Sequence, residues 1–106
     1  MEDPNQFIVP ESFVALFVAP GRVKPGESRA VIAARYELCE DLANHLIEYA
    51  RAQHHDLGIT ESDVLQRCLQ GLQSASSGFS APEAVWVVRR LAELEGWAWP
   101  EPPRSA

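Results

Sequence analysis

The apolar positions of this chain recur at helical spacing in each of its longer segments. The clearest pattern runs from about Arg29 to Asp56, where one half of a helix drawn at 100° per residue is apolar and the other half is polar. Such a helix would be roughly 40 Å long, longer than the average, and could extend beyond its neighbours. Its apolar half consists of Val31, Ile32, Tyr36, Leu38, Cys39, Leu42, Ala43, Leu46, Ile47, Tyr49 and Ala50.

Two more helices are predicted after the long one, which Gly58 ends. The first begins at Thr60, with Asp63 in the place of the usual Glu of a capping box, and is followed by a small-residue turn at 71–79. The second begins at a complete capping box, Ser80 to Glu83, and runs to about Glu95. The face expected to be buried on the first is Val64, Leu65, Cys68, Leu69 and Leu72. On the second it is Ala84, Val85, Val88, Leu91 and Ala92, widened by Val87 and Leu94.

The N-terminal part is expected to hold one short helix. After a flexible lead at 1–9, Pro10 opens a segment with Phe13, Leu16 and Phe17 at helical spacing, ending near Val18. The segment is apolar enough to be a buried strand instead. A loop at 19–27, with two Pro and two Gly, then leads to Ser28 as the N-cap of the long helix.

Together these elements predict an all-α fold, a compact bundle of about four helices around one long central helix. A length of 106 residues with 46% apolar composition suits one domain, expected at 10–99 and followed by a Pro-rich tail at 100–106. We expect a cytoplasmic protein, because there is no signal-peptide pattern and the longest apolar run, Phe13 to Ala19, is far shorter than a membrane span of ~20 residues.

Residues 21–28 reproduce the spacing of a phosphate-binding P-loop, G-x-x-x-x-G-K-[ST], with one decisive change. Glu27 stands where the Lys that meets the phosphates is required, and a carboxylate there repels that ligand. The chain is also too short for the several βαβ units of a nucleoside triphosphatase. We therefore expect no nucleotide cofactor.

The formal net charge of −6 argues against nucleic acid as the main partner. The segment 20–36 is the exception: its four cations and one acid give +3, which leaves −9 for the rest of the chain. It is expected to be a solvated loop beside acidic neighbours, or else a contact for an anion or acidic partner. A helix-turn-helix at 60–95 is the nucleic-acid alternative, although its connection of about nine residues is long for that motif and only Arg89 and Arg90 are basic at mid-helix.

Candidates for metal binding or catalysis are few. Asp41, His45 and Glu48 share the polar face of the long helix, but the chain lacks the second Glu-x-x-His set of a di-iron bundle, so a solvated face is the preferred interpretation. The adjacent His54 and His55 point to different sides of that helix and would stabilise its C-terminal end or act as a pH-sensitive contact. Neither Cys nor any Ser has a nucleophile signature around it, and both thiols are expected to be buried. We expect no catalytic or metal site, with a metal-binding protein or enzyme as the third-ranked alternative.

The preferred candidate site is a protein-binding surface on the last helix and tail. Trp86 projects away from the apolar face of its helix, beside two arginines, and Trp and Arg are enriched at interface hot spots. Trp86 could instead pack on the first helix or the tail, or be covered by Arg90. Of Trp97 and Trp99, only one is expected to cover the bundle if the segment is extended. The expected partner-binding residues are Trp86, Arg89, Arg90, Trp97, Trp99, Arg22 and Lys24.

Four runs of the chain, at 13–28, 35–43, 57–65 and 85–97, resemble a family of small bacterial proteins that carry the label "ATPase with chaperone activity". The resemblance covers most of the chain, but none of the runs is an established functional signature. The label implies a Clp-type ATP-driven unfoldase, from which this chain departs at Glu27, in its size and in lacking a magnesium-binding acidic strand. What the resemblance implies is an accessory to a chaperone or protease system, with no residue roles.

The sequence thus predicts a non-catalytic protein-protein interaction or adaptor domain. The partner would be a protein, with neither nucleic acid nor a membrane expected. Self-association as a homodimer is one form of this interaction, because a long amphipathic helix offers more apolar surface than three shorter neighbours would cover.

Overall fold

The computed structural model describes residues 9–99, all of whose regular elements are helical. They are α1 (Glu11–Val14), the 3₁₀ turn η1 (Ala15–Phe17), α2 (Arg29–Leu57), α3 (Glu61–Leu72), the 3₁₀ turn η2 (Ala75–Ser77) and α4 (Ala81–Glu95). The all-α bundle around one long helix is confirmed. The expected N-terminal lead and Pro-rich tail fall almost wholly outside the described residues.

Hydroxyl caps determine where the three longer helices begin. The side chains of Ser28, Thr60 and Ser80 each accept a hydrogen bond from the backbone N–H three residues further on. Glu83 completes the capping box of α4 by accepting from the N–H of Ser80 at 2.9 Å. Gly58 and Gly96, both in the left-handed conformation, follow the last residues of α2 and α4. These starts and stops agree with the sequence predictions.

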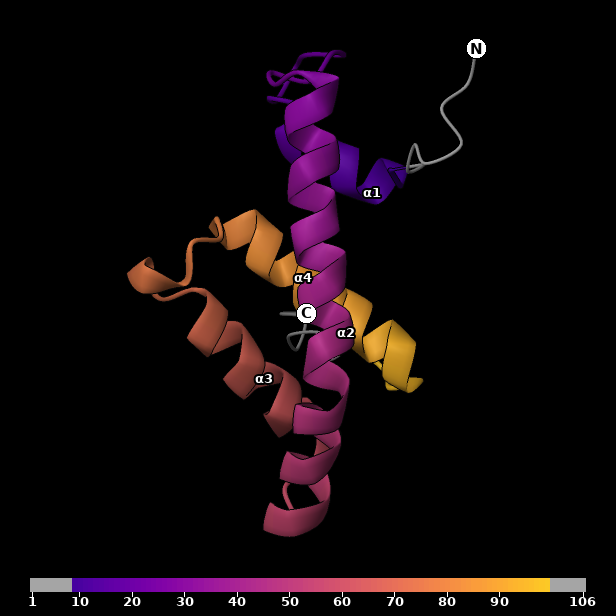
Figure 1. The fold of residues 1–106 in the computed structure, drawn as a ribbon, viewed down its shortest axis with the longest axis vertical. Coiled ribbons are helices and arrows are strands. Elements are labelled where there is room, and N and C mark those ends of the chain that lie inside the picture. The colour runs from indigo at the N-terminus through magenta and orange to yellow at the C-terminus, as the bar shows by residue number, and fades with distance from the viewer. Residues whose placement is uncertain (1–8, 100–106) are drawn as a thin grey trace, which may run out of the picture.

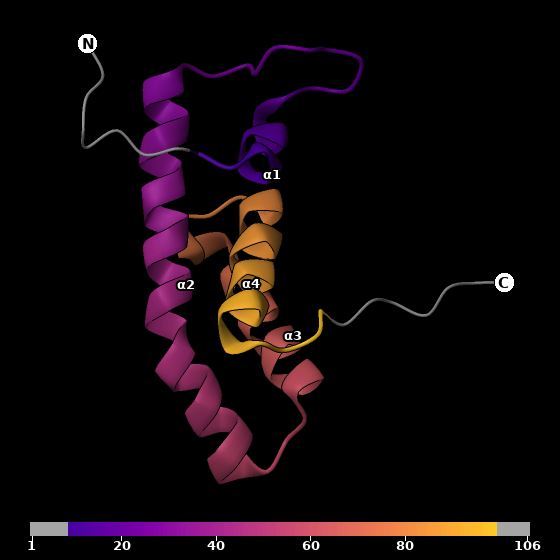
Figure 2. The ribbon, with the colours of Figure 1, turned by 90° about the vertical axis from the view of Figure 1, so that its right-hand side faces the viewer.

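Helix α2 forms the spine, and the other helices lie on one side of it (Figure 2). Helix α4 crosses α2 obliquely and packs against both α2 and α3, while α1 lies beside the N-terminal half of α2 (Figure 1). The C-terminal end of α2 extends beyond α4, where α3 begins. The segment 13–18, which could have been a helix or a strand, is helical: α1 continues directly into the 3₁₀ turn η1.

The core has two adjoining clusters. One joins α2, α3 and α4 through Ala50, Val64, Leu65, Cys68, Val88, Leu91 and Ala92. The other joins α1, α2 and α4 through Phe13, Ile32, Cys39, Ala43 and Val87. Leu46 and Leu72 pack against both clusters, so the two form one continuous interior.

One prediction about a buried face needs correction. On α4, Val87 is fully buried while Val85 is only half-buried, because the core lies under Ala84, Val88 and Leu91 rather than under Val85. On α2, Val31, Leu38 and Tyr49 belong to the apolar half but are exposed. The neighbouring helices pack on only part of that half, and the rest of its apolar surface faces solvent.

Candidate functional site

Trp86 packs on the first helix. Its ring meets Phe13 edge-on at a centroid distance of 5.1 Å and Tyr36 at 5.7 Å, and its indole N–H donates to Ser12 Oγ at 3.0 Å. These contacts hold one side of the indole against α1 and α2. Because Trp86 is only half-buried, the rest of the ring remains accessible.

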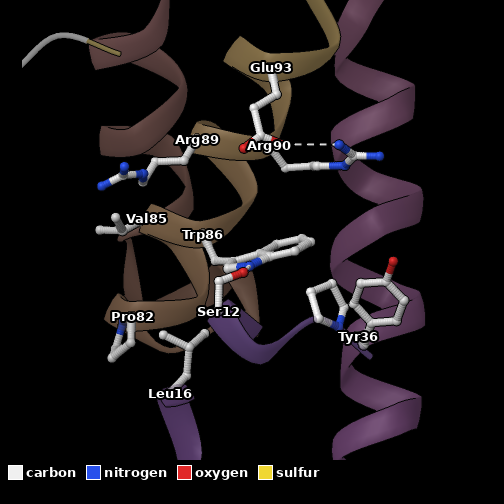
Figure 3. A pocket seen from close by; sticks show the side chains of 10 residues that line it. Ser12, Leu16, Tyr36, Pro82, Val85, Trp86, Arg89, Arg90 and Glu93 are labelled. Atoms are coloured by element: carbon white, nitrogen blue, oxygen red, sulfur yellow. Dashed lines mark hydrogen bonds and ion pairs between the residues drawn. The ribbon is translucent and has the colours of Figure 1, made fainter. Parts of the chain in front are cut away.

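The accessible part of Trp86 lines a hollow of about 610 Å³ between α1, α2 and α4. Figure 3 shows the indole near its centre, with residues of α1 on one side and Tyr36 of α2 on another. Six of the ten lining residues are apolar or aromatic, and charged side chains of α4 form one edge. The lining residues are Pro10, Ser12, Leu16, Tyr36, Pro82, Val85, Trp86, Arg89, Arg90 and Glu93.

The two arginines at the edge have different environments and leave α4 in opposite directions (Figure 3). Arg90 binds Glu40 of α2 through two bonds, Nε to Oε1 at 2.9 Å and Nη2 to Oε2 at 3.0 Å, and also Glu93 at 3.0 Å. The hydrogen bonds to Glu40 raise the pKa of Arg90 further above its usual value. Arg90 therefore ties α4 to α2.

Arg89 is exposed, and its guanidinium carbon lies 5.2 Å from the centroid of the Trp99 ring. Within residues 9–99 it forms no ion pair with a carboxylate. A cation that rests on an aromatic face keeps its hydrogen-bond donors available at the ring edge. Arg89 is thus the charge at the hollow that a ligand could use.

Both C-terminal tryptophans pack against the core cluster of α2, α3 and α4, contrary to the expectation that only one would. Gly96 adopts a φ of 74° and Trp97 N–H donates to Ala92 O at 2.8 Å, so the chain folds back across the end of α4. The Trp97 ring contacts His54 at 5.4 Å, while Trp99 lies on Arg89. Neither ring is fully exposed. Trp99 contacts Arg89, which lines the hollow.

Arg22 and Lys24 lie in the exposed loop that precedes α2. The loop resembling a P-loop is closed on its own backbone, since the Gly26 N–H donates to Phe17 O at 2.8 Å. It follows a 3₁₀ turn instead of a strand. The Gly26 N–H is therefore occupied, and a phosphate could use it only if this bond broke.

The histidines and the polar face of α2 do not converge on one point. His54 Nδ1 bonds Ile59 O at 2.7 Å just beyond the helix end, whereas His55 is exposed, so the two are separate, as expected. Asp41, His45 and Glu48 are all exposed. Among residues 9–99, no group of three or more potential metal ligands comes together.

Sequence reasoning missed a partly buried ion pair between α2 and α4. Arg35 donates from Nε to Glu83 Oε2 at 2.9 Å and from Nη2 to Oε1 at 2.7 Å, and it also reaches the Gly78 carbonyl at 3.0 Å. The hydrogen bonds from Arg35 lower the pKa of Glu83 despite its burial. The only local signal was the capping role of Glu83, which gave no hint of a partner 48 residues away.

Both cysteines are buried, as predicted. Desolvation raises the pKa of the Cys39 thiol to about 12, with a smaller contribution from the charge of Glu83. Burial also raises the pKa of Cys68. Each group is therefore a neutral thiol at physiological pH, which is the unreactive form.

Comparison with protein-family models, with curated proteins and with solved structures finds no match for this chain. In the part of the chain that the structure describes, no helix is both long and apolar enough to cross a membrane.

Proposed function

We propose that this protein acts through non-catalytic contacts with another protein, and that the hollow around Trp86 binds a short segment that is both apolar and acidic. The observation that carries this proposal is a hollow whose wall combines aromatic and aliphatic side chains with an exposed cation, Arg89, at its edge. The volume of this hollow lies within the range of known ligand sites.

The apolar part of the ligand follows from the lining. Leu16, Pro82 and Val85 line the hollow together with the indole, and the Trp86 N–H is already bound to Ser12. The indole therefore offers a ring surface and no free donor. A large apolar side chain that covers the ring would remove apolar surface from water on both partners.

The acidic part follows from the charges at the edge. Arg90 already has two carboxylate partners, whereas Arg89 has none among residues 9–99. A carboxylate of the ligand could bind the Arg89 guanidinium through two parallel bonds. The exposed Glu93 adds a negative charge nearby, which would disfavour a second acid on that side.

The alternative of a helix-turn-helix that binds nucleic acid has less support. Helix α4 packs against both α2 and α3, and Arg90 is neutralised by Glu40 and Glu93. A recognition helix must present several side chains to a groove, and α4 presents one available arginine. The resemblance noted in the sequence directs the search for a protein partner toward chaperone and protease systems.

The test is selection of binders from a random peptide library displayed on phage, followed by affinity measurement on synthetic peptides by fluorescence anisotropy. We expect enriched peptides that place an aromatic or large aliphatic residue beside Asp or Glu. Arg89→Glu should weaken their binding about tenfold by charge reversal at the contact. Arg67→Glu is the matched control, because Arg67 is an exposed arginine on α3 outside the lining of the hollow.

A second variant tests the hollow itself. Val85→Trp, which adds bulk to a half-buried lining residue, should abolish binding while circular dichroism shows an unchanged helical fold. The proposal fails if no acidic and apolar motif is enriched, or if Arg89→Glu and Arg67→Glu bind the peptides equally. Steep loss of binding to duplex DNA with added salt, in place of peptide binding, would establish the nucleic-acid alternative.

A further inference from the structure

The apolar side chains that the bundle leaves uncovered on α2 form one stripe. Val31, Leu38 and Tyr49 are 42%, 51% and 49% exposed, and Leu42 is half-buried between them. At 3.6 residues per turn, all four lie within about 40° of one another around the helix. We call these four residues the α2 stripe. The other helices lie on one side of α2 (Figure 2), and the exposed fractions of Val31, Leu38 and Tyr49 show that these helices leave the stripe uncovered.

The spacing of the α2 stripe is the same in both directions along the helix. Its members are separated by seven, four and seven residues, so the stripe is symmetric about position 40. An antiparallel copy of α2 centred on that position places Val31 opposite the partner's Tyr49, and Leu38 opposite the partner's Leu42. A twofold interface requires a surface that is complementary to itself in this way.

The charges at the two ends of α2 favour the same antiparallel arrangement. Arg22, Lys24 and Arg29 lie exposed at its N-terminal end together with one acid, Glu27, so these four residues carry a net charge of +2. Asp56, Glu61 and Asp63 lie exposed at its C-terminal end, around the start of α3. Within residues 9–99, none of these seven side chains takes part in an ion pair.

From these observations we infer that the α2 stripe is the interface of an antiparallel homodimer, in which the basic end of each α2 faces the acidic end of the other. A parallel pair would instead place the three cations of one copy beside the three cations of the other. It would also place the acids of the two copies side by side. This interface is separate from the Trp86 hollow, since the two surfaces share no residue. It adds a second copy of the chain as a partner.

The first test is sedimentation equilibrium of the full chain over a wide concentration range. We expect reversible dimerisation, and Leu38→Glu should raise the dissociation constant by at least about tenfold, because each dimer would bury two charges in place of two leucines. The matched control is Leu57→Glu, since Leu57 lies on the same helix, is 55% exposed and is not in the α2 stripe. A monomer at every concentration, or equal effects of the two substitutions, would overturn the inference.

The second test uses disulfide formation to determine whether the two α2 helices of the dimer run antiparallel or parallel. Because Cys39 and Cys68 are buried, an introduced surface cysteine would be the only reactive thiol within residues 9–99. The dimer predicts that Val31→Cys and Tyr49→Cys proteins cross-link when mixed. Neither should cross-link alone, since equivalent positions would lie roughly 27 Å apart at 1.5 Å per residue, far beyond disulfide reach. Cross-linking of Val31→Cys with itself would show a parallel pair and refute the proposed arrangement.

The two proposals can fail separately. Arg89→Glu should leave the dimer dissociation constant unchanged, and Leu38→Glu should leave peptide affinity unchanged. If Leu38→Glu abolished peptide binding in a folded protein, the α2 stripe would be the peptide site and the dimer inference would be wrong.

Discussion

Glu83→Gln tests the ion pair between Arg35 of α2 and Glu83 of α4. Glu83 Oε1 accepts from both the Ser80 N–H and Arg35 Nη2, while Oε2 accepts from Arg35 Nε. A glutamine can keep the Oε1 bonds, including the capping box, which tolerates Gln. Its amide nitrogen would then face the Arg35 Nε–H, donor against donor. The substitution therefore removes the ion pair while it preserves the helix cap.

The expected cost is about 2–3 kcal/mol of unfolding free energy. A hydrogen bond to a charged group contributes about 1.5–3 kcal/mol, and removal of one partner from a fully buried ion pair costs about 3–5 kcal/mol. The Glu83 side chain is 5% exposed but that of Arg35 is 30% exposed, so water reaches the arginine and the lower range applies. For a chain of this size the melting temperature should fall by roughly 10–20 °C.

The measurement is urea denaturation of both proteins followed by circular dichroism. The matched control is Glu93→Gln on the same helix, where the carboxylate is 69% exposed and Arg90 retains Glu40. That substitution should cost less than about 0.5 kcal/mol. A Glu83→Gln protein as stable as the Glu93→Gln protein would refute the assignment of a stabilising ion pair.

The same variant shows in which direction the stabilisation by Glu83 changes with pH. Because Arg35 lowers the pKa of Glu83 in the folded protein below its usual 4.5, the stabilisation is fully present above the pKa of the unfolded state. It is lost as the pH falls through the lower, folded-state pKa. The difference between wild type and Glu83→Gln should therefore be constant at neutral pH and shrink below about pH 4.5. A difference that grew on acidification would contradict this linkage.

The remaining predictions concern the buried thiols and two glycines. Because burial raises the pKa of Cys39 to about 12 and also raises that of Cys68, native protein at pH 8 should not react with a thiol reagent until it is denatured. Rapid native labelling would show that the core opens. Gly58→Ala should destabilise by about 1 kcal/mol, since φ is 68° there. Gly71→Ala, on the exposed side of α3 with open space around it, should stabilise by up to about 1 kcal/mol. Denaturation curves measure the unfolding free energy of both variants. If both substitutions changed it in the same direction, the assigned backbone conformations would be contradicted.

The sequence alone was enough to locate the helices, because the interactions that begin and end them are local. Each N-cap hydroxyl binds an N–H three residues away, and Gly58 ends α2 through its own left-handed conformation. Helical periodicity likewise identified most of the core of α3 and α4. Of the residues around the hollow, the sequence singles out Trp86 and Arg89, and the first helix is one of the places where it predicts that Trp86 packs.

The tertiary structure alone decided which candidate residues meet and which surfaces remain open. Arg35 and Glu83 are 48 residues apart in the chain, and Glu40 and Arg90 are 50 apart, so no local pattern pairs them. Both tryptophans of the C-terminal segment pack on the core, because the chain turns back after Gly96. Amphipathicity shows which half of a helix is apolar. How much of that half becomes buried depends on where the neighbouring helices cross it. For that reason the exposed stripe on α2 and the hollow at Trp86 could be identified only after the helices were packed together.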